Sequence, residues 1–465
     1  MKILFASWEL DPIFKVGGLA DVARSLPLAL IKKNIEVKAI LPYYSEIKLE
    51  GIEIQKTGSF EFEYKGKKEK VNVYHSKNEK TTAPFILLES RKFLSSLISK
   101  PESFAFFDLA ICEGLKKEAL GFDADIVHGN DWHAGLIPLL VRKLGLRQKT
   151  ILTIHNIAHQ GIADDKVLES IGIRKSSLLR DFGLPLKDKI DFLKISILLS
   201  NLLNTVSPTY AKEILTKEQG FGLEGVLDIR KKDLYGVLNG VDYDWLSSLE
   251  EKYVKYPREE KREFGKNEKR QNKKYLQQIL NLETTNRIPL VSYVGRLDPI
   301  QKGIDIIYQA VSDLKKSVQF VILGTGDPVW EKKMTAFSKK QKNVRMIARF
   351  DNPLAQQIYA SSDFVLVPSK YEPCGLVQMI AMYYGAIPIV RKTGGLADTV
   401  KDNVNGFVFD RYSPKQLEKA IKRAVKRWKN HRDRHEMMIK SALKADFSWD
   451  KSAEKYIRLY KKLLS

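Results

Sequence analysis

A short stretch between residues 368 and 400 combines glycine turns, apolar strand-like runs and a single carboxylate. Glu372-Pro373-Cys374-Gly375 follows an apolar, strand-like run, and Gly394-Gly395 follows the next such run, so each turn is predicted to open a helix. The N–H groups at a helix N-terminus have no partner within the helix and bind anions readily. Two such turns beside one carboxylate, Glu372, indicate a ligand in which a diphosphate is attached to a group rich in hydroxyls. For either turn taken alone, glycines that only permit a tight bend are the better interpretation.

The pentapeptide Gly-Gly-Leu-Ala-Asp occurs twice, beginning at Gly17 and at Gly394. A lysine, Lys15 or Lys392, stands two residues before each copy, and each copy lies between a strand-like run and an amphipathic run. The repetition predicts two similar α/β halves, each with a glycine loop at the carboxyl edge of its sheet, where open sheets bind ligands. We expect two such edges to face each other across a deep cleft.

Length and composition are those of a globular protein with more than one domain. The chain has 465 residues, of which 44% are hydrophobic and 29% are charged. No apolar run approaches the roughly 20 residues of a membrane span, and the apolar run at the N-terminus is too short for a signal peptide. The two cysteines, Cys112 and Cys374, provide no disulfide framework. We therefore expect a reduced, cytoplasmic setting and no membrane partner.

The net charge is +22, which suits nucleic acid, a membrane surface or an anionic small substrate. Acidic residues are interleaved among the lysines of segments 65–70 and 251–274. This pattern favours a solvated, lysine-rich surface over a nucleic-acid-binding face. No zinc-finger, basic-zipper or ribonucleoprotein motif supports nucleic acid as a partner, and we expect none.

Alternating strand and helix patterns in both halves predict an α/β protein with right-handed crossovers and largely parallel sheets. The predicted strands are 3–6, 37–41, 126–127, 150–154, 204–206 and 235–238 in the first half, and 290–294, 320–323, 344–348, 364–367 and 387–390 in the second. The predicted helices are 19–33, 103–120, 190–203, 303–314, 353–361, 414–430 and 448–464.

Three segments depart from this alternation. Residues 51–98 are strand-rich and polar, which predicts an inserted or edge hairpin region. Residues 161–188 are irregular and charged, which predicts a mobile flap or a surface that faces the acceptor. Residues 247–287 are strongly charged and poor in β-branched residues, which indicates a domain boundary. We expect domains at 1–246 and 247–447, with a final helix at 448–465 that crosses back to the first.

Eight motifs occur in a fixed order along the chain. They are Lys15-Val16-Gly17-Gly18-Leu19-Ala20-Asp21, Asp131-Trp132-His133-Ala134, His155-Asn156, Asn239-Gly240-Val241-Asp242, Gly295-Arg296-Leu297, Gln301-Lys302-Gly303, Glu372-Pro373-Cys374-Gly375-Leu376 and Thr393-Gly394-Gly395-Leu396-Ala397-Asp398-Thr399-Val400. Together they resemble bacterial glycogen synthase and the similar plant starch synthases, from residue 1 to about 455. One glycine pentapeptide is a weak signal, whereas the ordered set is specific.

The resemblance implies the GT-B architecture, in which two Rossmann-like, doubly wound domains face a cleft. It implies transfer of glucose from a nucleoside diphosphate to the non-reducing 4-hydroxyl of an α-1,4-glucan such as glycogen, with retention of configuration. ADP-glucose is the expected donor and UDP-glucose the alternative. It implies no cofactor, and the sequence leaves the oligomeric state open.

Departure of glucose leaves negative charge on the diphosphate, and no metal-binding aspartate pair is apparent in the sequence. Fixed donors must then hold that charge, and such donors are usually the largest catalytic contribution. Arg296, a planar fork, and Lys302, a point charge, are the predicted cations. The remaining predicted donors are Lys15 with the amides of Gly17 and Gly18 from the first domain, and the amides of Cys374, Gly375 and Leu376 from the second.

The resemblance also implies contacts to the sugar. Glu372 would hold glucose hydroxyls, with a covalent nucleophile as the alternative role. His155 would contact the sugar near its 6-hydroxyl. Asp131 would position the acceptor hydroxyl or polarise the site, and capping of the following helix is its alternative.

Further predicted binding residues are less specific. Phe350 stands where the family stacks an aromatic ring on the base, a contact that tolerates adenine and uracil alike. Asn239 is expected to contact glucose, or only to form an Asn-Gly turn. Asp21 is expected near the donor, or as a helix cap. Asn156 and Thr393 complete the predicted set, whereas Trp132 and His133 are expected to pack.

The sequence departs from the family pattern at three places. Five residues separate Arg296 from Lys302, one more than is usual, and Val16 replaces a common threonine. Ile380 stands eight residues after Glu372, where many transferases of this architecture have a second glutamate, which favours the starch and glycogen branch over enzymes that make small glucosides such as sucrose. A non-catalytic protein that binds nucleotide-sugar or glucan is a further alternative, and the retained Lys15, His155, Arg296 and Glu372 argue against it.

Overall fold

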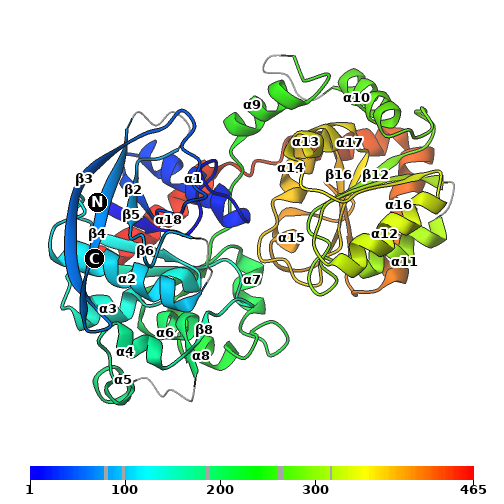
Figure 1. Cartoon of the computed structure of the whole chain (residues 1–465). Helices are drawn as coiled ribbons and strands as arrows, with labels where there is room; N and C mark the ends of the chain where they lie inside the picture. The colour runs from blue at the N-terminus through cyan, green and yellow to red at the C-terminus, as the bar shows by residue number, and fades with distance from the viewer. Residues whose placement is uncertain (78–81, 97–99, 184–188, 260–264, 315–316) are drawn as a thin grey trace. The chain divides into compact units, whose positions relative to one another are not determined.

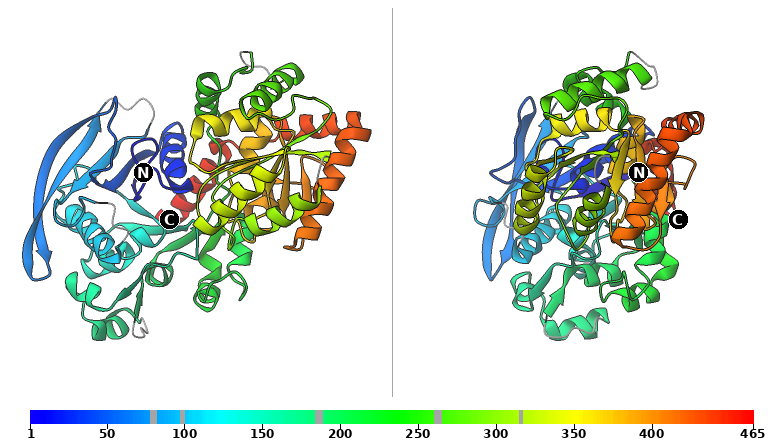
Figure 2. Two further views of the ribbon diagram at one scale, coloured as in Figure 1. Left: turned by 45° about the vertical axis from the view of Figure 1, so that its right-hand side comes forward. Right: turned by 90° about the vertical axis from the view of Figure 1, so that its right-hand side faces the viewer.

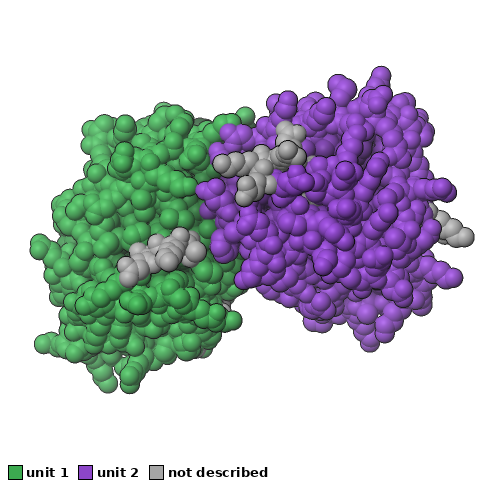
Figure 3. Space-filling view, turned by 90° about the horizontal axis from the view of Figure 1, so that it is seen from above, with its two compact units in different colours: residues 1–240, 449–465 green, residues 241–448 purple. Residues whose placement is uncertain are grey.

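The computed structural model describes residues 1–77, 82–96, 100–183, 189–259, 265–314 and 317–465. The chain divides into two compact units, which are Met1–Gly240 with Trp449–Ser465, and Val241–Ser448 (Figure 3). The boundary expected between residues 246 and 247 falls inside helix α9 (Tyr243–Tyr253). This helix starts earlier than the composition suggested, because the Asp242 side chain accepts a hydrogen bond from the N–H of Trp245 at its first turn.

In the part of the chain that the structure describes, unit 1 contains a nine-stranded sheet in the order β11-β10-β7-β6-β1-β2-β5-β4-β3. Its strands are β1 (Lys2–Ala6), β2 (Glu36–Pro42), β3 (Glu53–Tyr64), β4 (Lys67–Lys77), β5 (Phe85–Glu89), β6 (Ile126–Asn130), β7 (Lys149–Ile154), β10 (Leu202–Thr205) and β11 (Leu234–Gly236). Strands β3 and β4 form a long antiparallel hairpin at one edge (Figure 1), which confirms the hairpin expected between residues 51 and 98. The strands from β11 to β5 pair in parallel.

Unit 1 contains the following helices among its described residues. They are α1 (Gly18–Ile31), α2 (Pro101–Lys116), α3 (Ile137–Lys143), α4 (Lys166–Ser170), α5 (Lys175–Phe182), α6 (Phe192–Leu199), α7 (Pro208–Glu213), α8 (Glu224–Ile229) and α18 (Trp449–Leu464), with short 3₁₀ turns at Trp132–Ala134 and Lys231–Asp233. Helices α1 and α18 lie side by side (Figures 1 and 2). Tyr456 and Tyr460 of α18 are buried in one cluster with Phe5 and Leu26, so the last helix completes the core of unit 1.

A chain of buried polar side chains joins α18 to the middle of the sheet. The Nδ1 atom of His128 lies 2.8 Å from the hydroxyl of Tyr460, and its Nε2 atom lies 2.7 Å from the hydroxyl of Thr153. Asn204 donates to Thr153 and to the hydroxyl of Tyr456. Burial lowers the pKa of His128 to about 3, so this ring is neutral at physiological pH.

Replacing Tyr460 by phenylalanine is expected to lower the free energy of unfolding by about 1–3 kcal/mol, because a ring nitrogen of His128 then stays buried without a partner. Tyr235→Phe is the matched control, since among the described residues its hydroxyl has a hydrogen bond only with Lys462, which is exposed. Urea unfolding followed by tryptophan fluorescence measures both variants. Equal midpoints for the two variants would show that the buried network contributes no more than a surface contact.

Unit 2 contains, within its described residues, a six-stranded parallel sheet in the order β14-β13-β12-β15-β16-β17. The strands are β12 (Leu290–Val294), β13 (Gln319–Leu323), β14 (Val344–Ile347), β15 (Phe364–Val367), β16 (Ile387–Arg391) and β17 (Phe407–Phe409). The helices besides α9 are α10 (Lys266–Ile279), α11 (Ile304–Leu314), α12 (Pro328–Lys340), α13 (Asn352–Ser361), α14 (Val377–Tyr383), α15 (Gly394–Thr399), α16 (Pro414–Asn430) and α17 (Arg432–Leu443).

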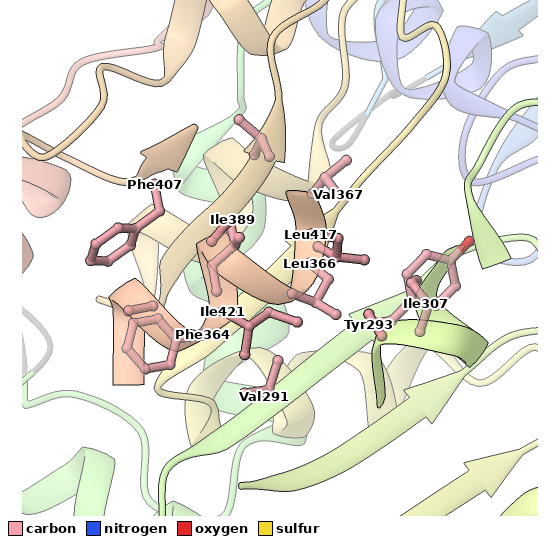
Figure 4. Close-up of a cluster of buried hydrophobic side chains, with 14 of the residues drawn as sticks. Val291, Tyr293, Ile307, Phe364, Leu366, Val367, Ile389, Phe407, Leu417 and Ile421 are labelled. Atoms are coloured by element: carbon pink, nitrogen blue, oxygen red, sulfur yellow. The ribbon is translucent and has the colours of Figure 1, made fainter. Parts of the chain in front are cut away.

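Helices cover both faces of this sheet, so most residues of its strands are apolar and buried. Phe320 and Ile322 belong to a cluster with α11 and α16, whereas Val321 and Leu323 belong to a second cluster with α13. Figure 4 shows part of the first cluster, where Leu417 and Ile421 of α16 lie near strand residues such as Leu366 and Ile389. Successive side chains of a strand point to opposite faces, so alternate residues of β13 pack into two separate hydrophobic cores.

Two secondary-structure predictions are wrong. The described part of the segment expected to be irregular, residues 161–183, contains β8 (Ile162–Asp164), which pairs with β9 (Lys189–Asp191), and the helices α4 and α5. Residues 184–188 lie outside the described part. The helix expected at 190–203 is shorter, because Asp191 caps α6 by accepting from the N–H of Lys194, and Leu202 already belongs to β10.

Helices α12 and α17 were not predicted. The sequence holds a start signal for α12, since Asp327 accepts from the N–H groups of Val329 and Trp330, and Pro328 takes the first helical position. None of the described helices combines the length and the apolar character that a membrane crossing needs.

Candidate functional site

Each sheet has a point where the strand order reverses, and open α/β sheets bind ligands outside the carboxyl ends of the strands at such points. In unit 1 the chain runs outward from β1 to β2 on one side and returns to β6 on the other. In unit 2 the same reversal lies between β12 and β15. The loops at these ends and the first turn of α1 carry most of the residues predicted from the sequence: Lys15, Gly17, Gly18, Asp21 and Asp131 in unit 1, and Arg296, Lys302, Glu372, Cys374, Gly375 and Leu376 in unit 2. The expectation that the two sets face each other across a cleft stays a prediction.

Lys15 lies in the loop after β1, where carboxylates hold its ammonium group. Its Nζ atom is 2.5 Å from Asp21 Oδ1 and 3.8 Å from Asp11 Oδ1. Burial lowers the pKa of Lys15, but Asp21 and Asp11 raise it by more, so the group stays protonated. Asp21 lies in the first turn of α1. The structure therefore presents a fixed positive charge at this strand end.

Glu9 accepts hydrogen bonds from the amides of the glycine loop, a contact that no sequence pattern indicated. Its Oε2 atom accepts from the N–H groups of Val16 and Gly17, both at 2.7 Å, and the side chain is buried. The Gly17 amide, predicted to contact a diphosphate, is thus engaged within the loop. Gly18 lies in open space, with nothing within 4 Å of the position of an added Cβ. A phosphate would have to compete with the Glu9 carboxylate for Gly17.

Asp131 ends β6 with a left-handed backbone, at a φ of 55°. This conformation is uncommon for a residue other than glycine and costs free energy. Its Oδ1 atom accepts from the N–H of His155 at 2.7 Å and from that of Asn156 at 3.3 Å. It makes no capping bond to the turn that begins at Trp132, so the alternative capping role is wrong. Asp131 instead joins the ends of β6 and β7.

Burial is the largest influence on the pKa values of Asp131 and His155. It raises the pKa of Asp131 to about 7, against the two backbone N–H groups that lower it. It lowers the pKa of His155 to about 3, so the imidazole is neutral. Near neutral pH the site therefore holds a carboxyl group close to its midpoint beside an uncharged histidine.

Changing Asp131 to asparagine is expected to remove a pH dependence of kcat/KM. If ionised Asp131 accepts from the acceptor hydroxyl, wild-type kcat/KM rises with pH through about 7, whereas Asp131→Asn is slower and flat there. Rates of nucleoside diphosphate release between pH 5.5 and 8.5 test this. A variant that keeps the wild-type limb would assign the titration to another group.

The same variant tests the folded-state pKa. Asp131 holds a proton in the folded protein between about pH 4 and 7, where the unfolded chain has released it, so its contribution to stability falls as pH rises. Stability of Asp131→Asn relative to wild type should therefore increase over that range. His128 and His155 titrate in the opposite sense, and both proteins retain them.

The buried carboxylate of Glu372 and the partly exposed ammonium group of Lys302 form an ion pair at the reversal point of unit 2. Lys302 Nζ donates to both carboxylate oxygens of Glu372, at 2.8 and 2.7 Å, and Ser369 donates to Oε2 at 2.7 Å. The Glu372 side chain is 7% exposed and that of Lys302 is 24% exposed. The carboxylate is therefore held in one orientation by three hydrogen bonds.

The glycine pair at 394 and 395 packs directly on the loop of Glu372. A Cβ on Gly394, whose φ is +43°, would lie 1.9 Å from the Glu372 carbonyl oxygen. A Cβ on Gly395 would lie 2.1 Å from the Cys374 carbonyl oxygen, and the Gly395 N–H donates to the Glu372 carbonyl. These glycines let α15 start against the loop, as predicted. Thr393, just before them, is fully buried.

The helix expected to open at Glu372 starts later, at Val377. Gly375 has a φ of +74°, which is outside the right-handed helical region and keeps residues 372–376 in a loop. The amides of Cys374, Gly375 and Leu376 therefore belong to that loop. Their predicted contact with phosphate stays a prediction.

Arg296 and the inserted residue of its loop have a clear local structure. Asp298 Oδ1 accepts from the N–H groups of Ile300 and Gln301, which closes the turn and accommodates the additional residue. Gln301 then accepts from Arg296 Nη2 at 2.9 Å. The Arg296 side chain is 59% exposed, so the guanidinium is oriented and still accessible.

Exposed apolar side chains follow three neighbouring strands of unit 2. Phe350 after β14 is 81% exposed, and Ile300 after β12 and Val329 after β13 are each 71% exposed. The sequence singled out only Phe350, although an apolar residue in a polar loop after a strand was a usable signal for the others. This edge offers apolar surface beside Arg296.

The remaining predicted residues lie in unit 1. Asn156 accepts from the N–H of Ala158 with its Oδ1 atom and so supports its own turn. Asn239, just after β11, is buried, and its Oδ1 atom has no hydrogen-bond partner among the described residues. Trp132 and His133 are buried and stack with ring centroids 4.0 Å apart, which confirms that they pack.

Comparison with known proteins identifies the family. Residues 2–229 match the starch synthase catalytic domain, and residues 273–444 match glycosyl transferases group 1. The chain is 40% identical to the glycogen synthases of Thermosipho melanesiensis and of Geotalea daltonii, over 100% of this chain and 99% of each relative.

Solved structures agree with this result. The catalytic domain of starch synthase IV from Arabidopsis thaliana, bound to ADP and acarbose, has a TM-score of 0.90 and 31% identity, over 100% of this chain and 99% of that one. Sucrose-phosphate synthase from Thermosynechococcus elongatus shares the fold, with a TM-score of 0.64 and 18% identity over 100% and 99% of the two chains. The chain belongs to the glycogen synthase and starch synthase family of glucosyltransferases, with the GT-B fold.

Proposed function

We propose that the protein transfers glucose from ADP-glucose to the non-reducing 4-hydroxyl of an α-1,4-glucan, with retention of configuration and without a metal ion. The observation that carries this proposal is the ion pair of Glu372 and Lys302 at the reversal point of unit 2, in the loops after β12 and β15, the first of which also carries Arg296. The choice of ADP-glucose over UDP-glucose is supported by the ADP bound to the similar starch synthase IV structure.

In this proposal Lys302 contacts both the phosphate and Glu372, the residue that holds the sugar. An ammonium group has three donors, and two of them contact Glu372. The third is available for a phosphate oxygen, while Arg296 supplies a planar fork. Charge that develops on the leaving diphosphate meets groups already in place, which lowers the barrier. Lys15 and the Gly18 amide of unit 1 add donors in the same role.

Glu372 holds glucose hydroxyls rather than attacking the anomeric carbon. Three hydrogen bonds fix its carboxylate, which suits orientation of a sugar and would oppose the movement that a nucleophile needs. The leaving phosphate then takes the proton of the acceptor hydroxyl on the same face of the sugar. His155 and Asn239 contact the glucose, Asp131 positions the acceptor, and Phe350 stacks on the base.

Initial rates with ADP-glucose and with UDP-glucose on one glycogen acceptor test the proposal. Glucan-dependent release of ADP, unchanged by EDTA, is the expected result. Faster release from UDP-glucose would reassign the donor. Release from neither donor, together with measurable binding of glycogen, would favour a non-catalytic binding protein.

The setting of the reaction is also a proposal. Cys112 and Cys374 are both free and buried, which supports a reducing, cytoplasmic environment. The test is mass spectrometry of the protein from its native cells after rapid thiol blocking. Both cysteines should carry the blocking group, which shows that neither was in a disulfide. An intact intermolecular disulfide would contradict the proposal.

A further inference from the structure

Asn130, the last residue of β6, lies beside His155 and is absent from the motifs that identified the site. Its side chain is 1% exposed, and its Oδ1 atom lies 2.9 Å from Nε2 of His155. The pairing of β6 with β7 brings the two residues together, since Asn130 lies opposite Thr153, two residues before His155. The contact is thus built into the register of the sheet.

The neighbours of Asn130 fix the orientation of its amide. Its nitrogen donates to the carbonyl oxygen of Ala6 at 2.9 Å and contacts the carbonyl oxygen of His128 at 3.4 Å. A carbonyl oxygen only accepts hydrogen bonds, so a flipped amide would bring oxygen against oxygen at both contacts. The oxygen of Asn130 must therefore face His155.

This orientation decides which ring nitrogen of His155 carries the proton. An amide oxygen only accepts, so Nε2 of His155 must donate to it. Burial keeps the imidazole neutral, and a neutral ring has one N–H and one bare nitrogen. The bare nitrogen is then Nδ1, which has no hydrogen-bond partner among the residues that the structure describes.

We propose that Asn130 is a positioning residue that holds His155 in the Nε2–H form, so that its Nδ1 lone pair accepts a hydrogen bond from a hydroxyl of the donor sugar. The inference rests on the proposed function for the identity of the ligand, and the tautomer itself rests on the structure alone. In this form His155 accepts from the sugar and donates nothing to it. The site therefore selects a hydroxyl at that position over a group that lacks a hydrogen to donate.

The tautomer is tested by nitrogen NMR of the full-length protein without ligand, labelled with ¹⁵N at histidine and assigned with His155→Gln. Wild type should show a protonated Nε2 and a bare Nδ1 that does not titrate above pH 5. Asn130→Ala should show ring nitrogens averaged between the two forms. Asn130→Asp is the conservative rescue, because a protonated carboxyl group can donate to Ala6 and accept from His155 as the amide does.

Two NMR outcomes would overturn the inference. One is a wild-type His155 with the proton on Nδ1. The other is an Asn130→Ala spectrum whose His155 shifts match those of wild type. Neither measurement uses turnover, so a protein without glucosyltransferase activity would refute the proposed function and leave the tautomer testable.

The hydroxyl contact is tested by kinetics with ADP-glucose and its 6-deoxy analogue. Loss of one hydrogen bond predicts about tenfold lower kcat/KM for Asn130→Ala with ADP-glucose, and a similar loss for wild type with the analogue. When Asn130→Ala is assayed with the 6-deoxy analogue, kcat/KM should fall by about the same factor as for either change alone. The two changes remove the same contact, so their effects should not multiply. Losses that multiply fully would mean that Asn130 acts only on the fold. Asn130→Asp should recover most of the rate.

Discussion

Replacing Lys302 by alanine is expected to reduce kcat by about 10²–10³-fold, the cost of losing one preorganised donor to a developing negative charge. The same change leaves the buried Glu372 carboxylate with the Ser369 hydroxyl as its one side-chain donor among the described residues. Breaking one partner of a buried pair destabilises a protein, and because Lys302 is partly exposed we expect about 1–3 kcal/mol.

A second substitution separates the two effects. In the double variant Lys302→Ala with Glu372→Gln, the unpaired charge is gone, so the urea midpoint should return toward that of wild type while kcat stays low. Lys370→Ala is the matched control, since Lys370 is exposed in the same loop. A single variant with kcat within threefold of wild type would exclude Lys302 from stabilising the leaving group.

The sequence was sufficient for the parallel sheets and for the loops that carry the site. Apolar runs such as Phe364–Val367 are buried on both faces, and such strands are unambiguous when helices alternate with them. Because parallel strands end at one edge, polar residues after the strands had to gather there. This is why the loops of Arg296, Lys302 and Glu372 lie at one edge of the sheet, whereas the roles predicted for these residues rest on the motifs that resemble the family.

Contacts between side chains and distant backbone were not predictable from the sequence. No local pattern connects Glu9 with the glycine loop, and only the closed loop brings it to the amides of Val16 and Gly17. Asn130 meets His155 because of the register between β6 and β7, which no local pattern specifies. Such partners decide which donors and acceptors are available, so the protonation state of the site needed the structure.

Irregular composition also misled the prediction. Residues 161–188 lack strong periodicity, yet the β8–β9 pair closes the segment by contacts between residues far apart in the sequence. Short elements of this kind depend on tertiary pairing more than on propensity.

The two copies of Gly-Gly-Leu-Ala-Asp are expected to differ sharply in their tolerance of alanine. Gly395→Ala places a methyl group 2.1 Å from the Cys374 carbonyl oxygen and 2.5 Å from the Cys374 Cα atom, which are backbone atoms that cannot rotate away. The equivalent change in the first copy, Gly18→Ala, meets nothing within 4 Å. We expect Gly395→Ala to lose about 1–3 kcal/mol of stability through overpacking, and Gly18→Ala to keep or slightly gain stability in α1.

The same clash is expected to lower kcat as well as stability. To admit the methyl group, α15 must separate from the loop that holds Glu372, whose carbonyl oxygen accepts from the Gly395 N–H. A displacement of about 1 Å at a reacting centre costs about 10²-fold in rate, so kcat of Gly395→Ala should fall by about that factor even in the fraction that is folded. Urea midpoints of both glycine variants and the kcat of Gly395→Ala test this. Equal urea midpoints for Gly395→Ala and Gly18→Ala would contradict the clash. They would mean that the second glycine of each pentapeptide only permits a tight bend.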